Sequence, residues 1–221
     1  MTQQQGDAIL KELQQIRQLL ERLVKATPAR TAPNPAPPAK VKVNTGHSYS
    51  LGRGDAPITM VEFTDYQCPY CMRFHTTVFE DLKKNYVDTG KLRFISHDLP
   101  LGFYANAMGA ARAGRCAGEQ GKFWELRNLL INSSKDLSPE AINKYAQGVG
   151  LDMTAFRACF DSDKYKDEIQ KDVAEANALG ITGTPTFVIG RTAPDKIEGP
   201  RFVGAMPYAF FEARLKEALD N

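Results

Sequence analysis

Hydrophobic residues in the first part of the chain follow a seven-residue repeat. Within DAILKELQQIRQLLERLVK, residues 7–25, the apolar positions are separated alternately by four and three residues: Ile9, Leu13, Ile16, Leu20 and Leu23. This spacing places them along one side of a helix, as in a coiled coil. We therefore predict an amphipathic helix over residues 1–25. With Leu at position a and Ile at position d, the pattern favours trimers or tetramers over dimers.

The role of this helix stays open between two alternatives. It can be an oligomerisation segment, or it can pack on the globular part of the same chain. Fewer than three heptads make an isolated coiled coil marginal.

A proline-rich and alanine-rich stretch follows the helix. The segment ATPARTAPNPAPPAK, residues 26–40, holds five of the 13 prolines and no large apolar residue. Such a composition favours an extended, semi-rigid spacer, and this favours self-association over docking of the helix. We predict a linker over residues 26–47 and a globular domain over residues 48–221. A disordered tail, in which the helix has no role, is the alternative.

The globular part begins with a strand, a helix and a second strand. PITMVEFT, residues 57–64, is a β-branched and aromatic run typical of a buried strand. Apolar residues then recur every four positions from Pro69 to about Asp88, which predicts a helix that ends at Gly90. KLRFIS, residues 91–96, predicts the second strand. The sequence CPYC lies where the first strand meets the helix.

Helical patterns fill the next part of the chain, residues 104–180. Ser138 followed by Pro139, and Asp152 after a glycine, are signals for helix starts. Strand character returns in TFVIG, residues 186–190, and RFVG, residues 201–204, before a last helix from Pro207. We predict four to five helices inserted between a β-α-β unit and a β-β-α ending.

Composition and charge exclude several classes of protein. The chain is 43% apolar and 24% charged, which fits one globular domain with an appendage. Its 28 basic and 26 acidic residues nearly cancel, so we expect no nucleic-acid partner. No apolar run approaches the roughly 20 residues of a membrane span. The N-terminal MTQQQGDAILKELQQ is polar, so it does not predict a signal peptide.

A CxxC pair can bind zinc, form a structural disulfide, or exchange between dithiol and disulfide. Cys68 lies at the first turn of the predicted helix, where unpaired N–H groups and the helix dipole stabilise a thiolate. We therefore expect Cys68 to be the nucleophile and Cys71, one turn later, to resolve the mixed disulfide. Pro69 suits the first helical position, where its missing N–H costs nothing.

The order of elements resembles the thioredoxin superfamily. A strand, CPYC, a helix, a strand, a helical insertion and a Thr-Pro before a β-β-α ending share its arrangement. The segments EFTDYQCPYC, AARAGRCAGEQGKFW and GITGTPTFVIG resemble the bacterial DsbA-like thiol-disulfide oxidoreductases over roughly residues 48–220. This resemblance implies an α/β thioredoxin fold with a central mixed sheet, and a redox-active Cys68–Cys71 disulfide without a further cofactor.

The resemblance also implies roles for other residues. Pro185 matches the cis-proline that faces the cysteine pair, where the backbone of the preceding residue, Thr184, pairs with an extended substrate. Pro69 and Tyr70, within CPYC, are expected to contact substrate as well. Glu62 matches a buried acid below the pair; burial would raise its pKa and let it take the proton from Cys71. The alternation within TMVEFT does not settle whether Glu62 faces the core or solvent.

His75 allows a different function. The spacing C-x2-C-x3-H could hold zinc or copper(I), so a soft-metal binding protein is the alternative to an oxidoreductase. A fourth ligand is not evident, so we expect no metal site and a helix-surface His75 that tunes local charge. Asp65 and Gln67, beside the pair, are expected to be turn residues between strand and helix.

Cys116 and Cys159 lie 43 positions apart in the predicted insertion. They could form a structural disulfide in an oxidising compartment, or remain buried thiols in the cytosol. The resemblance implies the bacterial cell envelope or periplasm, which favours the disulfide.

The resemblance implies clients and a recycling partner, but it leaves the direction of reaction open. The expected clients are unfolded or misfolded cysteine-containing exported proteins, and a membrane redox partner would recycle the pair. CPYC and the threonine before Pro185 differ from the histidine-containing dipeptide and valine of the best-known oxidases. They resemble disulfide isomerases and related reductases, so both oxidation and isomerisation are expected possibilities.

Overall fold

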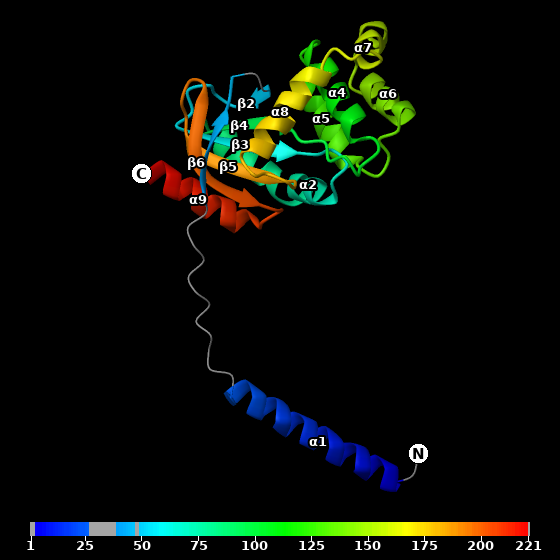
Figure 1. The fold of residues 1–221 in the computed structure, drawn as a ribbon, viewed down its shortest axis with the longest axis vertical. Helices are drawn as coiled ribbons and strands as arrows, with labels where there is room; N and C mark the ends of the chain where they lie inside the picture. Colours follow the sequence, from blue (N-terminus) through cyan, green and yellow to red (C-terminus); the bar gives the residue numbers. More distant parts are fainter. Residues whose placement is uncertain (1–2, 27–38, 47–48, 221) are drawn as a thin grey trace. The chain divides into compact units, whose positions relative to one another are not determined.

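The N-terminal unit of the chain contains one long helix. The computed structural model describes residues 3–26, 39–46 and 49–220, and the chain separates into two units, Met1–Pro37 and Pro38–Asn221. Helix α1 (Gln3–Ala26) forms where the heptad pattern predicts it (Figure 1). The side chains of Ile9, Leu13 and Ile16 are exposed. Residues 27–38 of the predicted spacer lie outside the described residues.

A six-stranded mixed sheet forms the centre of the second unit, within the described residues, in the order β1-β6-β5-β3-β4-β2 (Figure 1). Strands β3 and β4 are parallel, and the other neighbouring strands are antiparallel. The strands are β1 (Lys40–Asn44), β2 (Tyr49–Leu51), β3 (Ile58–Thr64), β4 (Leu92–Asp98), β5 (Thr186–Arg191) and β6 (Lys196–Val203).

Two of these strands were not predicted. Strand β1 falls within the predicted linker 26–47, yet it pairs with β6 along its whole length, from Lys40 opposite Pro200 to Asn44 opposite Lys196. The globular unit therefore starts earlier than residue 48. Both β1 and β2 are short edge strands, and their stability depends on pairing with distant segments that the local pattern does not reveal.

The helix that follows CPYC is continuous but contains two π-helical segments. It runs through α2 (Pro69–Phe74), η1 (His75–Phe79), α3 (Glu80–Leu82) and η2 (Lys83–Val87), and Gly90 follows it with a φ of 74°. Apolar residues spaced by four drift by about 40° per step around an ideal α-helix. The wider π turns compensate for this drift. Phe74, Val78, Leu82 and Tyr86 therefore all stay buried.

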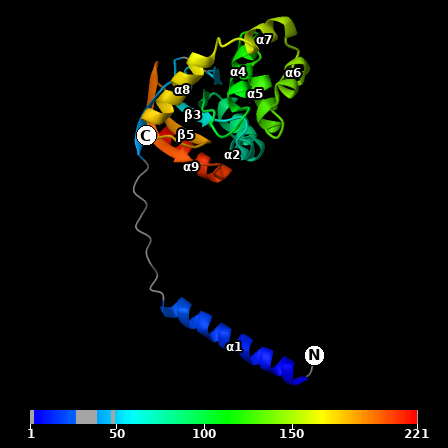
Figure 2. The same ribbon diagram turned by 45° about the vertical axis from the view of Figure 1, so that its right-hand side comes forward.

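Five helices lie between β4 and β5, in agreement with the four to five predicted. They are α4 (Ala107–Gly118), α5 (Phe123–Asn132), α6 (Pro139–Gly148), α7 (Met153–Phe160) and α8 (Lys166–Ala178). Helices α4 to α7 gather at one end of the sheet and share a core of their own (Figures 1 and 2). Ser138 and Asp152 cap the starts of α6 and α7, as the sequence predicts.

Alternate side chains of β3 point to opposite faces of the sheet, and each face has its own hydrophobic core. Ile58 and Met60 pack with the helix that follows CPYC and with the final helix, α9 (Tyr208–Asp220). Val61 and Phe63 pack on the other face with residues of α8 and β1. Glu62 therefore points toward the helix that carries the cysteines. No helix in the described part of the chain is both long enough and apolar enough to cross a bilayer.

Candidate active site

Cys68 caps the N-terminus of α2, and Cys71 lies in its first turn. Cys68 has an extended backbone, with φ −73° and ψ 122°, and Pro69 occupies the start of the helix. The backbone N–H of Cys68 donates to the carbonyl oxygen of Asp65 at 3.1 Å. Both cysteines are reduced and buried. The chain reversal between β3 and α2 thus presents the Cys68 sulfur to the exposed N–H groups of the helix.

The two thiols of this pair differ in acidity. A hydrogen bond from the Cys71 thiol is the main cause that lowers the pKa of Cys68 to about 5, assisted by the backbone N–H groups of Cys71 and Tyr70 and opposed by burial. Burial raises the pKa of Cys71 well above its usual value, and the hydrogen bond to Cys68 and the charge of Glu62 add to this effect. Near neutral pH the pair therefore holds one thiolate, on Cys68, and one thiol, on Cys71.

The loop before β5 lies against Cys68. The Thr184–Pro185 peptide bond is cis, and the carbonyl oxygen of Thr184 lies 3.4 Å from the Cys68 sulfur. Pro69 and Tyr70 are exposed beside the sulfur, with 59% of Tyr70 accessible. The structure thus brings together the cysteines and the four residues expected to contact substrate, Pro69, Tyr70, Thr184 and Pro185.

Glu62 is buried, but its charge state differs from the prediction. Its carboxylate accepts a hydrogen bond from Nη2 of Arg127 at 2.6 Å, and Nε2 of His75 lies 3.0 Å from Oε2. Burial would raise the pKa of Glu62, but its interactions with the His75 ring and with the positively charged Arg127 outweigh this effect and lower the pKa. The expected raised pKa is therefore wrong, and an ionised Glu62 is a poor acceptor for the proton of Cys71.

His75 is also placed differently from the prediction. It is buried rather than on the helix surface, its ring bonds to Glu62, and burial lowers its pKa. The π segment η1 begins at His75, and the ring of His75 faces Glu62 on β3. In the described part of the chain no group of three or more His, Cys, Asp or Glu side chains is arranged to hold a metal ion. The structure therefore does not support the soft-metal alternative.

Arg127 is a site residue that the sequence analysis missed. It is fully buried on α5, donates from Nε to Ser96 at 3.0 Å, and lies over the ring of Trp124 at 5.2 Å. A signal was present, since Phe123, Arg127 and Ile131 share one face of an amphipathic helix. A charged residue within an apolar stripe needs a buried partner.

Asp65 forms the predicted turn, and the pKa of its carboxyl group is raised. Its Oδ1 accepts from the backbone N–H of Gln67 and its Oδ2 from that of Leu101, both at 2.7 Å. Burial raises the pKa of Asp65 to about 6, partly offset by these hydrogen bonds. The sequence indicated the turn, but not the burial of the carboxylate.

A disulfide joins two helices of the insertion. Cys116 on α4 and Cys159 on α7 are bonded, with their Cα atoms 5.8 Å apart. Beside it on α4, the buried Arg115 donates to Asp98 at the end of β4 and to Asp172 on α8. The disulfide links two helices within the insertion, and the Arg115 ion pairs link the insertion to the sheet.

Comparisons with known proteins agree with this arrangement. A family model described as Thioredoxin matches residues 44–201. Among curated proteins, the Na(+)/H(+) antiporter NhaA 3 of Salinispora tropica is 35% identical over 180 residues, which are 80% of this chain and 27% of the antiporter. The chain thus spans about a quarter of the length of the curated relatives it matches first.

Two solved structures share the fold over most of both chains. The α-DsbA1 of Wolbachia pipientis is 28% identical, with a TM-score of 0.71 over 79% of this chain and 92% of that one. A thioredoxin-like oxidoreductase from Silicibacter pomeroyi is 26% identical, with a TM-score of 0.65 over 79% of this chain and 93% of that one.

Proposed function

Because this chain belongs to the thioredoxin family, we propose that it is a DsbA-like thiol-disulfide oxidoreductase that acts on cysteines of exported proteins. One observation carries the proposal: Cys68 lies at a helix N-terminus beside the cis Thr184–Pro185 peptide, with its pKa lowered to about 5 and the pKa of Cys71 raised. This combination suits the exchange of disulfides with a second chain.

In the oxidising direction the pair begins as a Cys68–Cys71 disulfide. A client thiolate attacks the Cys68 sulfur, which forms a mixed disulfide and releases Cys71, and Cys71 takes up a proton. A second client thiolate then attacks the client sulfur of the mixed disulfide, so that the client gains a disulfide and Cys68 leaves as a thiolate. The client loses two electrons and the pair gains two. The pKa of about 5 makes Cys68 a good leaving group.

In isomerisation the reduced pair starts the reaction. The Cys68 thiolate attacks a client disulfide, which forms a mixed disulfide and releases a client thiolate. That thiolate attacks another client disulfide, and the client thiolate formed last attacks the client sulfur of the mixed disulfide, so that Cys68 leaves as a thiolate and the pair stays reduced. If the mixed disulfide persists, Cys71 loses its proton to solvent and attacks the Cys68 sulfur; the client then leaves as a thiolate, having gained two electrons, and the pair becomes a disulfide.

Burial and the negative charge of the ionised Glu62 raise the pKa of Cys71. In isomerisation they keep the proton on Cys71 until the mixed disulfide has formed, and in oxidation they favour the uptake of a proton by the released Cys71.

The proposed clients are unfolded or misfolded chains. An extended client segment would pair with the backbone at Thr184 through main-chain hydrogen bonds, which depend little on side-chain identity. The Cys116–Cys159 disulfide favours an oxidising compartment, and so we propose the periplasm or bacterial cell envelope. There a membrane redox partner would recycle the pair, with no cofactor beyond Cys68 and Cys71. Because acidic and basic residues nearly balance, we propose no nucleic-acid partner.

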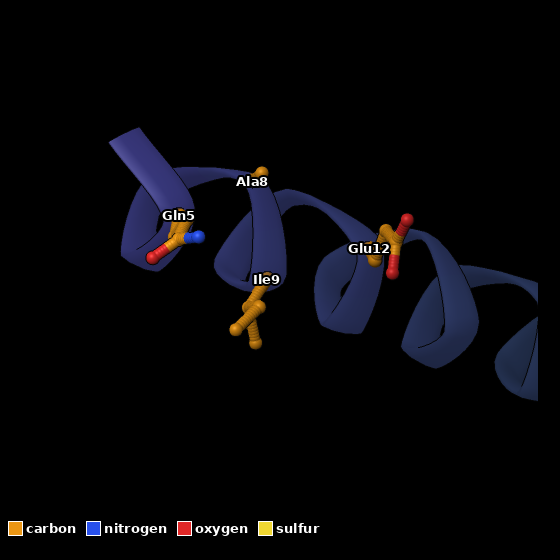
Figure 3. A pocket seen from close by; sticks show the side chains of 4 residues that line it. All are labelled: Gln5, Ala8, Ile9 and Glu12. Atoms are coloured by element: carbon orange, nitrogen blue, oxygen red, sulfur yellow. The ribbon is translucent and has the colours of Figure 1, made fainter. Parts of the chain in front are cut away.

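The proposal includes self-association through α1. Exposed apolar side chains run along the helix from Ile9 to Leu19, and a second copy of this helix is the occupant that matches their heptad spacing. Figure 3 shows a hollow at the start of this stripe, lined by Gln5, Ala8, Ile9 and Glu12. All four side chains come from one helix, so the hollow has no opposing wall for a small ligand.

A glutathione-buffered redox titration of the cysteine pair, combined with refolding of a protein with scrambled disulfides, tests the function. We expect a potential well above the roughly −270 mV of thioredoxin, because stabilising the Cys68 thiolate favours the reduced pair. We also expect recovery of the correctly bonded client, which the Cys68→Ser variant does not give. A potential near that of thioredoxin without oxidation or reshuffling of the client would contradict the proposal.

A further inference from the structure

Hydrogen bonds join the turn that carries Cys68 to the segment between β4 and α4, residues 99–106. The Asp65 carboxylate accepts from the backbone N–H of Leu101 at 2.7 Å. The Gln67 side chain accepts from the backbone N–H of Asn106 at 3.0 Å. Two side chains of one short turn thus hold this segment at both of its ends.

The segment presents aromatic side chains next to the redox pair. Phe103 is 76% exposed, and its ring lies 4.5 Å from that of Tyr104. After burial, the charges of Cys68 and Asp65 are the main causes that raise the pKa of Tyr104, so Tyr104 lies within electrostatic range of both. Tyr70 is exposed on the cysteine side. We call Tyr70, Phe103 and Tyr104 the aromatic rim.

The exposure of the rim is unusual for this unit. In the described part of the globular unit, the exposed large hydrophobic residues are Tyr70, Phe103 and Val203, and two of these three belong to the rim. Exposed aromatic side chains gathered at one place are typical of a contact surface, since they bury much apolar area with few rotatable bonds. An unfolded client displays apolar side chains beside its cysteines, so exposed aromatic side chains close to Cys68 offer such a residue a contact.

We propose that Asp65 is a positioning residue that sets client preference, because it holds the aromatic rim beside Cys68. The proposal rests on the proposed disulfide exchange and adds a substrate class to it: clients with an aromatic or large aliphatic residue next to the reacting cysteine. Asp65 acts through Leu101 on Phe103 and Tyr104, and the rim contacts the client.

The chemistry of the turn explains why this position holds an aspartate. A carboxylate has two acceptor oxygens, and Asp65 uses one for Gln67 and the other for Leu101. Asparagine offers one acceptor oxygen and one donor nitrogen, so it leaves one of these N–H groups without a partner. Asp65→Asn therefore keeps the size of the side chain but removes one of its two hydrogen bonds, to Gln67 or to Leu101, and weakens the attachment of residues 99–106 to the turn.

The test compares two peptides in the intact protein. Each peptide carries one cysteine as a mixed disulfide with glutathione, and the neighbouring residue is Phe in one and Ser in the other. The rate constant of the reduced protein is measured with both, and the Phe/Ser ratio is the readout. A change in the reactivity of Cys68 affects both rates alike and leaves the ratio unchanged.

We expect a ratio of about five to ten for the unaltered chain, as one partly buried aromatic contact implies. Asp65→Asn, Gln67→Ala and Phe103→Ser should each bring the ratio toward one, and Asp65→Asn should add nothing in the Phe103→Ser background. Asp152→Asn is the matched control, because Asp152 also accepts two backbone N–H groups, but at the start of α7. Its ratio should stay unchanged.

Three results would overturn the proposal: a ratio near one in the unaltered chain, an unchanged ratio in Asp65→Asn or Gln67→Ala, or an additive effect with Phe103→Ser. If Asp65→Asn does not fold, the Phe/Ser ratio of the Gln67→Ala variant tests the proposal instead. Failure of the unaltered chain to react with either peptide would instead contradict the proposed function.

Discussion

The guanidinium of Arg127 lies 2.6 Å from the carboxylate of Glu62, and both side chains are inaccessible to solvent. Arg127 belongs to α5 in the helical insertion and Glu62 to the central strand β3, so this ion pair joins the two parts of the domain below the cysteines. His75 completes the arrangement from the helix that carries Cys68 and Cys71. The buried carboxylate of Glu62, on the sheet, thus interacts with the helical insertion through Arg127 and with the helix that carries the cysteines through His75.

Arg127→Met should destabilise the protein by about 3–5 kcal/mol, because it leaves the Glu62 charge buried without its main partner. Urea unfolding measures this loss. The same substitution in a Glu62→Gln background should cost much less, since no charge remains to be compensated. Arg157→Met, at an exposed position on α7, is the control and should change stability by less than about 0.5 kcal/mol. Equal losses in both backgrounds would show that Arg127 acts through packing alone.

The ultraviolet absorbance of the thiolate should titrate with a midpoint of about pH 5 in the reduced protein, because hydrogen bonding from Cys71 lowers the pKa of Cys68 to about 5. Cys71→Ser weakens the main hydrogen bond to the thiolate, and so it should raise this midpoint. Cys68→Ser should remove the transition, because the pKa of Cys71 is raised well above its usual value. A midpoint above pH 8 in the unaltered protein would contradict the assignment of Cys68 as the nucleophile.

The reduced protein should gain stability relative to the oxidised protein as pH rises from 5 to 9. In this window an unfolded chain binds a proton at Cys68, whose ordinary pKa is about 9, whereas the folded chain does not. The stabilisation that the Cys68 thiolate gives the reduced protein is complete above pH 9 and is lost as the pH falls through about 5. At pH 7 a folded pKa of about 5 contributes roughly 3 kcal/mol, a figure that solvent screening reduces.

Thermal unfolding of both redox forms across this range measures the effect. The Cys68→Ser variant is the control, and its stability should lack this pH dependence. If the difference in stability between the reduced and oxidised forms stays constant from pH 5 to pH 8, the prediction is wrong.

Replacing Cys116 and Cys159 together by alanine should cost about 2–5 kcal/mol, because the bridge closes a loop of 43 residues in the unfolded chain. Denaturant unfolding provides the measurement. The reaction with the serine-flanked peptide should stay within about threefold below the unfolding transition, because the bridge lies within the insertion and not at Cys68. A large loss of this reaction with unchanged stability would point to a direct role in exchange.

Leu13→Lys and Ile16→Lys should each reduce the assembly state of the chain, because they place a charge in the apolar stripe of α1. Sedimentation velocity measures the mass per particle. Gln14→Lys adds the same charge at an exposed polar position of the same helix and should leave the mass unchanged. If all three variants and the unaltered chain sediment as monomers, self-association through α1 is wrong.

Local signals in the sequence determined much of the site. Pro69 at a helix start and Gly90 at a helix end each act within a few residues, so the β-α-β unit and the positions of Cys68 and Cys71 could be placed in advance. The resemblance supplied the place of Pro185 opposite the pair. The heptads and the caps at Ser138 and Asp152 likewise predicted helices that the structure contains. The resemblance to the DsbA-like family rested on these same segments.

Only the tertiary structure decided the electrostatics of the site and the edges of the sheet. The charge of Glu62 depends on Arg127, 65 positions later, and on the buried ring of His75. The carboxylate of Asp65 is bonded to a segment 36 positions away. Strands β1 and β2 exist through pairing with β6 and β4. A pKa and an edge strand both depend on which distant groups lie within a few ångströms, and that proximity is a property of the folded chain.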